Sequence, residues 1–165
     1  MARIDYIVDP TTIDFSNVID DIEGIRATNP QRFEMEQLTA ILVDDGEREI
    51  CVGYKDIAKD EFWTRGHMPD MPLMPGVLMC EAAAQLSSYY ATKHKLMGEY
   101  RVGFGALDSV KFRGMVQPGD RLLIVLQKTK GRIGQLVVCK FQAFVDNNLV
   151  CEGVIKGIPL PHSLD

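Results

Sequence analysis

The chain has 165 residues, 46% of them apolar, with 18 basic and 23 acidic side chains and a net charge of −5. This length and composition indicate one domain with a substantial core, spanning residues 1–165, and exclude a globally disordered chain. The net negative charge argues against non-specific nucleic-acid binding, which needs a basic field over the whole molecule, but leaves room for local basic patches.

Two features favour a cytoplasmic location. The first five residues, Met-Ala-Arg-Ile-Asp, lack the basic stretch and apolar run of a secretory signal. The four cysteines stand alone among apolar residues, without a C-x-x-C pair or a histidine at metal-ligand spacing. We therefore expect buried, reduced thiols and no metal site. The cysteines are Cys51, Cys80, Cys139 and Cys151.

The first third of the chain predicts a short helix and a hairpin. Ser16 can cap a helix that runs to about residue 26, with apolar residues recurring on one face, and the Asn-Pro pair at 29–30 ends it. Residues 33–43 carry a loose strand pattern, followed by an Asp-Asp-Gly turn and a returning strand over 49–54.

Residues 71–92 contain a single charged side chain, that of Glu81. A window of this length could cross a membrane, but it holds two prolines and several polar residues, so we expect no membrane span. Met-Pro pairs recur every three residues from 68 to 75, which predicts a stiff, non-helical lead-in. Pro75 suits the first turn of a helix over about 75–96, whose apolar residues cover nearly every face and predict burial on all sides.

The remainder of the chain predicts four strands in series, with a hairpin at Asn147-Asn148. We expect them to form an antiparallel meander, giving an α+β fold in which one long sheet curls around one buried helix. The strands cover residues 101–112, 122–127, 136–145 and 149–158.

Glu81 is the first candidate for chemistry. A carboxylate on a helix buried on all sides is desolvated, which should raise its pKa and keep it protonated as a general acid. The alternative is a structural glutamate, bonded to a backbone group or an arginine, or reaching a solvent-filled edge.

His67 and Gly76 complete the candidate set. His67 lies 14 residues before Glu81, on a loop that could fold back onto the helix, and histidine is suited to taking a proton near pH 7. Gly76 lies in the first helical turn, where free backbone N–H groups could stabilise an oxygen that gains negative charge. The alternatives are an ordinary loop or core histidine and simple packing at a helix start. Together the three residues favour a β-elimination, or in reverse a hydration, next to a carbonyl.

The residues around this set resemble the Z-type β-hydroxyacyl-[acyl carrier protein] dehydratases. The likeness rests on Gly-His-Met-Pro at 66–69 and Pro-Leu-Met-Pro-Gly-Val-Leu-Met-Cys-Glu-Ala-Ala-Ala-Gln at 72–85. The stretches Phe-Gly-Ala-Leu-Asp at 104–108 and Val-Gln-Pro-Gly-Asp at 116–120 are also similar to that family. The resemblance extends over roughly residues 30–158.

This resemblance implies a hot-dog fold and a homodimer, often assembled as a trimer of dimers, in which His67 of one chain faces Glu81 of the other. It implies a 3-hydroxyacyl substrate on the phosphopantetheine arm of acyl carrier protein and no cofactor of the enzyme's own. His67 is then the base, Glu81 the acid, and the Gly76 N–H polarises the thioester carbonyl. Related A-type enzymes, which also isomerise the double bond, carry aspartate at the acid position, so Glu81 favours plain dehydration. The implied substrate contacts are Met68, Pro75, Val77, Gln85 and Phe104.

Several positions depart from the family pattern. Gln31 stands where the family usually has histidine, Met68 where it has phenylalanine, and Gly103 where a gating tyrosine is often found. The chain also continues past the usual end with Pro-Leu-Pro-His at 159–162. These changes leave the proposed chemistry intact but bear on acyl-chain length and access.

Docking of an acidic carrier protein to this acidic chain would require a local basic patch. Two other functions fit the same fold: an acyl thioesterase, and a non-catalytic acyl-carrier-binding homologue. The candidate docking residues are Lys111, Arg113, Lys128, Lys130 and Arg132.

Overall fold

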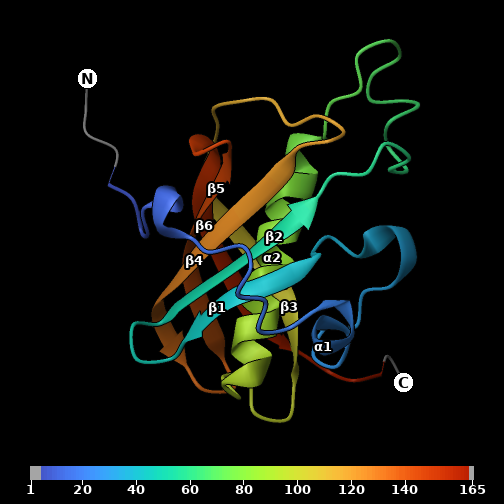
Figure 1. The fold of residues 1–165 in the computed structure, drawn as a ribbon. Helices are drawn as coiled ribbons and strands as arrows, with labels where there is room; N and C mark the ends of the chain where they lie inside the picture. The colour runs from blue at the N-terminus through green and yellow to red at the C-terminus, as the bar shows by residue number, and fades with distance from the viewer. Residues whose placement is uncertain (1–4, 164–165) are drawn as a thin grey trace.

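The computed structural model describes residues 5–163 and has the expected α+β architecture, a six-stranded antiparallel sheet curled around one long helix (Figure 1). Residues 1–4, which carry most of the segment in which a secretory signal was sought, lie outside the described residues. Among the described residues, no helix is long and apolar enough to span a membrane.

The strand order is β1-β2-β4-β5-β6-β3, which corrects the expected meander. Of the four strands expected in series, only β4, β5 and β6 pair in chain order, whereas β3 pairs with β6 at the far edge. Five consecutive residues of β4 are buried, which requires cover on both faces, while most of β3 is exposed, as suits an edge. The strands are β1 Ala40–Asp45, β2 Ile50–Asp56, β3 Arg101–Phe112, β4 Arg121–Arg132, β5 Leu136–Val145 and β6 Asn148–Leu160.

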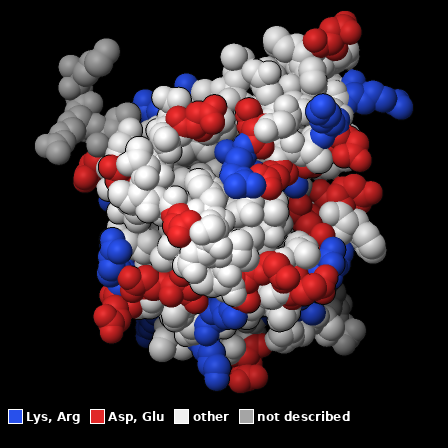
Figure 2. Space-filling model, in the orientation of Figure 1, with Lys and Arg blue, Asp and Glu red and all other residues white. Residues whose placement is uncertain are grey.

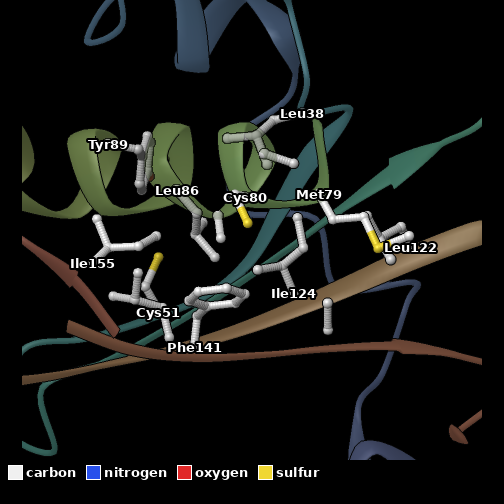
Figure 3. Close-up of a cluster of buried hydrophobic side chains, with 14 of the residues drawn as sticks. Leu38, Cys51, Met79, Cys80, Leu86, Tyr89, Leu122, Ile124, Phe141 and Ile155 are labelled. Atoms are coloured by element: carbon white, nitrogen blue, oxygen red, sulfur yellow. The ribbon is translucent and has the colours of Figure 1, made fainter. Parts of the chain in front are cut away.

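Both faces of the sheet are covered. On the inner face, helix α2 (Gly76–Lys93) points Leu86 toward Ile124 and Phe141 of the sheet (Figure 3). Tyr89 belongs to the same apolar cluster. On the outer face, the N-terminal segment crosses β1, β2, β4 and β5, and its Phe15 joins a second apolar cluster (Figure 1). The alternating residues of β4 supply both clusters, which explains its continuous burial.

The N-terminal expectations were partly wrong. Helix α1 is only Ile22–Arg26, and Asp21 caps it by accepting from two backbone N–H groups. Ser16 does not cap it, because its hydroxyl donates to Asp14 at 2.7 Å. The residues before the helix are extended, since Ile19 and Asp20 hydrogen-bond to Ile41 of β1.

The strand expected over 33–43 begins only at Ala40, and Phe33–Met35 forms a 3₁₀ turn, η2. A second short 3₁₀ turn, η1, covers Pro10–Thr12. The β5–β6 hairpin turns at Asp146 and Asn147, one residue earlier than expected. Both residues have positive φ, 48° and 64°, as a two-residue turn that matches strand twist requires.

Helix α2 ends at Lys93, three residues before the expected end, and Pro75 is its N-cap residue. The expected burial on every side is wrong for the described chain: Val77 is 71% exposed and Glu81 is only partly buried. One side of the first two turns is therefore open. The four cysteines are free and buried as expected, and burial raises the pKa of the Cys139 thiol to about 11.

Candidate active site

His67 lies on the loop 57–75, which joins β2 to α2 and projects from the body of the molecule (green, upper right in Figure 1). Ile57, Trp63 and Met74 anchor this loop, each at most 5% exposed. The Trp63 carbonyl accepts hydrogen bonds from the N–H groups of Gly66, at 3.1 Å, and His67, at 2.8 Å. The buried tryptophan therefore holds the backbone that carries the exposed imidazole.

The imidazole of His67 is oriented by its own loop. Its Nδ1 lies 2.7 Å from the Leu73 carbonyl oxygen, and the Leu73 N–H donates to the His67 carbonyl at 2.9 Å. A carbonyl oxygen can only accept, so Nδ1 carries the proton and donates it. In the neutral ring, the lone pair of Nε2 is then left free to act as a base.

Gly76 begins α2 immediately after Pro75, which makes no side-chain capping bond. A Cβ atom at position 76 would lie 2.7 Å from Cε1 of Phe112, whose ring packs on the glycine. Glycine therefore lets the β3 end and the helix N-terminus approach closely. The first N–H groups of a helix have no intrahelical partner and attract negative charge.

Glu81 is held by a buried amide. Gln85, 2% exposed, donates from Nε2 to Glu81 Oε1 at 2.8 Å and to the Met35 carbonyl at 2.6 Å. Its Oε1 accepts from the Gln37 N–H at 2.9 Å. These partners define the amide orientation, because one is a backbone donor and another a backbone acceptor. Oε1 of Glu81 must therefore accept, which leaves Oε2 as the position for a proton.

A small hollow of about 70 Å³ lies beside Glu81, between α2 and β3. Phe104 lines it, as do two positions at which the chain departs from the family pattern, Gln31 and Gly103. His67 is not among its lining residues. The described chain thus brings Glu81, Gln85 and Phe104 together and leaves His67 apart.

The remaining expected substrate contacts lie on the open side of the chain. Met68 is 40% and Val77 is 71% exposed, and Pro75 is partly buried at the helix start. Among residues 5–163, no three His, Cys, Asp or Glu side chains are grouped as metal ligands would be.

The backbone of Met35 and Gln37 was missed as part of the site. The pattern of residues 33–43 predicts a strand, whereas the turn η2 and the residues after it place these groups against Gln85. The available signal was the i, i+4 spacing of Glu81 and Gln85, which puts both side chains on one helix face.

A family model described as FabA-like domain matches residues 29–154. The chain belongs to the FabA-like family. It is 36% identical over 135 residues to the 3-hydroxyacyl-[acyl-carrier-protein] dehydratase FabZ of Geobacillus sp. (strain WCH70), covering 80% of this chain and 90% of that protein. The protein of the same name from Campylobacter jejuni (strain RM1221) is 34% identical over 145 residues, covering 84% of this chain and 96% of the relative.

Solved structures agree on the fold. The chain resembles the dehydratase heterocomplex ApeI:P from Xenorhabdus doucetiae with a TM-score of 0.71 at 11% identity, covering 84% of this chain and 91% of that one. It also resembles Cj0977, a sigma28-regulated virulence protein from Campylobacter jejuni, with a TM-score of 0.66 at 14% identity, covering 92% of this chain and 99% of that one. These likenesses confirm the expected hot-dog fold.

Proposed function

We propose that the chain is a 3-hydroxyacyl-[acyl carrier protein] dehydratase. This hydro-lyase removes water from a 3-hydroxyacyl thioester to give the trans-2-enoyl thioester, in the biosynthesis of fatty acids or a related lipid. Family membership and the FabZ relatives support the reaction class. The observation that carries the proposal is the hydrogen bond from His67 Nδ1 to Leu73, because it leaves Nε2 as a free base.

The three candidate residues divide the reaction between them. Nε2 of His67 takes the proton from C2 of the substrate, and the Gly76 N–H stabilises the negative charge that develops on the thioester oxygen. The C3–O bond then breaks, and Glu81 donates the proton on Oε2 to the departing hydroxyl, which leaves as water. The phosphopantetheine arm of the carrier protein supplies the thioester, so the reaction requires no further cofactor.

The active enzyme is proposed to be a homodimer, with His67 of one chain facing Glu81 of the other. The edge strand β3 supports this arrangement, because among the described residues it pairs only with β6. Its exposed apolar side chains include Phe104, Leu107 and Phe112, at 47%, 39% and 53% exposure. A second copy of the chain would cover this edge and bring a His67 loop to the hollow at Glu81. Further assembly into a trimer of dimers belongs to the same proposal.

The proposed partner is acyl carrier protein in the cytoplasm. Acidic and basic side chains are interspersed on the face shown in Figure 2, so docking would use a local patch rather than a broad field. Glu152 holds Arg113 and Glu49 holds Lys128. Lys111, Lys130 and Arg132 have no carboxylate partner among the described residues and are the better docking candidates.

The test is the hydration of crotonyl and longer 2-enoyl thioesters on carrier protein. The reaction is measured as the loss of the conjugated double bond. His67→Ala and Glu81→Gln should abolish it, while His94→Gln and Glu47→Gln serve as matched controls. Full activity in both site variants would disprove the assignment. Release of free thiol from acyl-CoA without hydration would identify a thioesterase instead, and binding of acyl carrier protein without either reaction would identify a non-catalytic partner.

A further inference from the structure

A second hollow lies beyond Glu81, along the C-terminal half of α2. It has a volume of about 430 Å³ and lies between the segment after α1, the start of β3 and the C-terminal tail. It shares Ser88 and Val102 with the hollow that contains Glu81. The two hollows are therefore neighbours along α2, and we call the second one the distal cleft.

The distal cleft is rich in basic side chains although the whole chain is net acidic. Its lining includes Arg26, Arg32, Arg101 and His162, and the single carboxylate among its lining residues is that of Glu99. His162 belongs to the C-terminal stretch that extends past the resemblance to the dehydratase family.

Two of these arginines form no ion pair. Glu23 and Glu36 neutralise Arg26, but Arg32 donates only to backbone carbonyls, at 2.7, 2.7 and 3.1 Å. Neither Arg32 nor Arg101 forms an ion pair with any of the described residues.

His162 holds Arg101 in place. Its Nε2 lies 2.6 Å from the Glu99 carbonyl and must donate, so its Nδ1 accepts from Arg101 Nε at 3.1 Å. The two terminal amino groups of Arg101 have no partner among the described residues. This planar fork matches the two oxygens of a carboxylate.

The order of the proposed site residues along α2 places the distal cleft at the far end of the acyl chain. In the proposed reaction the thioester is held at Gly76, at the start of α2, and Glu81 follows along the helix. Ser88 is seven residues, roughly 10 Å of helix, beyond Glu81. The phosphate of the carrier arm would lie toward the opposite end of the helix, so the cationic groups do not serve it. The route is also partly polar, since Gln31 contributes a buried Oε1 atom without a hydrogen-bond partner.

We infer that the distal cleft binds an anionic terminal group, a carboxylate, at the end of a medium-length acyl chain. This inference rests on the proposed dehydratase function and assigns its substrate class: acyl thioesters that carry a second carboxyl group. Arg101 and Arg32 are the specificity-determining residues, and His162 positions Arg101.

Binding and turnover test the inference separately. Saturated acyl-pantetheines of equal length, ending in methyl, hydroxyl or carboxylate, are titrated into the intact protein by calorimetry. We expect the carboxylate-ended ligand to bind roughly ten- to a hundred-fold more tightly than the methyl-ended one, as a charge-assisted hydrogen bond provides. Arg101→Gln should remove most of this preference, and the exposed Lys140→Gln should leave it unchanged.

The corresponding 2-enoyl thioesters give the catalytic readout. Arg101→Gln and Arg32→Gln should lower kcat/KM about tenfold or more for the carboxylate-ended substrate and leave crotonyl hydration unchanged, because the short chain stops before the cleft. Equal binding of the methyl- and carboxylate-ended ligands, or a preference that survives Arg101→Gln, would overturn the inference. Failure to hydrate any enoyl thioester, with the carboxylate preference intact, would instead count against the dehydratase function alone.

Discussion

The proposed base and acid are held in place in different ways. His67 is exposed on a projecting loop, and its hydrogen bonds go to Trp63 and Leu73, both close in sequence. Glu81 lies on the core helix, and Gln85 fixes it through backbone groups 48 and 50 residues away. A locally held group can be altered without disturbing the fold, whereas a group held by distant contacts links activity to stability.

The largest expected effect is that of His67→Ala. Loss of the base should lower kcat for enoyl hydration by roughly 10²–10⁴-fold. The melting temperature should stay close to that of the parent protein, because the imidazole is exposed and bonded only within its loop. Hydration assays and thermal unfolding of the same variant test whether activity is lost while stability is kept. A large loss of stability would show that the loop is not independent of the core.

Gln85→Leu should reduce both activity and stability. The change leaves the Gln37 N–H and Met35 carbonyl without a buried partner, which costs about 2 kcal/mol of unfolding free energy, and releases the Glu81 carboxyl. We expect kcat to fall about tenfold as the proton position on Glu81 is lost. Urea unfolding and hydration kinetics measure the two effects, with exposed Gln135→Leu as the control. An unchanged kcat would show that the Gln85 amide does not support the proposed acid, Glu81.

Gly76→Ala tests the helix start, where the loop that carries His67 joins the helix that carries Glu81. The new methyl group would collide with the Phe112 ring, so the ring or the helix start must shift away from the thioester position. We expect kcat/KM for crotonyl thioester to fall about tenfold, with a smaller effect on stability. Phe112→Ala in the same chain should restore part of the loss. Gly131→Ala, where the nearest atom is the flexible Lys128 Cε at 3.1 Å, is the matched control.

The smallest expected effect concerns acid stability. Hydrogen bonds from Tyr89 and Lys93 of α2 lower the pKa of Asp20 below its usual value of 3.8. Its carboxylate therefore stabilises the fold above that usual pKa, and this contribution is lost as the pH falls through the lowered value. Urea unfolding between pH 7 and pH 3 should show a shallower acid decline for Asp20→Asn. An unchanged decline would mean that this contact does not tie the helix to the N-terminal segment.

The sequence alone supplied the α+β fold class, the positions of most strands, and the start of α2 at Pro75-Gly76. It also supplied His67, Gly76 and Glu81 with a matching reaction. The structure confirms the fold class, most strand positions and the helix start, because side-chain periodicity and proline stiffness act over short stretches of chain. The roles of the three site residues stay a prediction.

Only the tertiary structure decided how distant segments meet. It placed β3 beside β6, replaced the Ser16 cap with Asp21, put η2 behind Gln85, and brought Arg101 and His162 to the distal cleft. The same nonlocal contacts left His67 away from the hollow at Glu81. Pairing between strands and burial between elements depend on neighbours that no local pattern encodes. The loop that carries the proposed base was therefore predictable from the sequence, whereas the surroundings of the proposed acid emerged only in the folded chain.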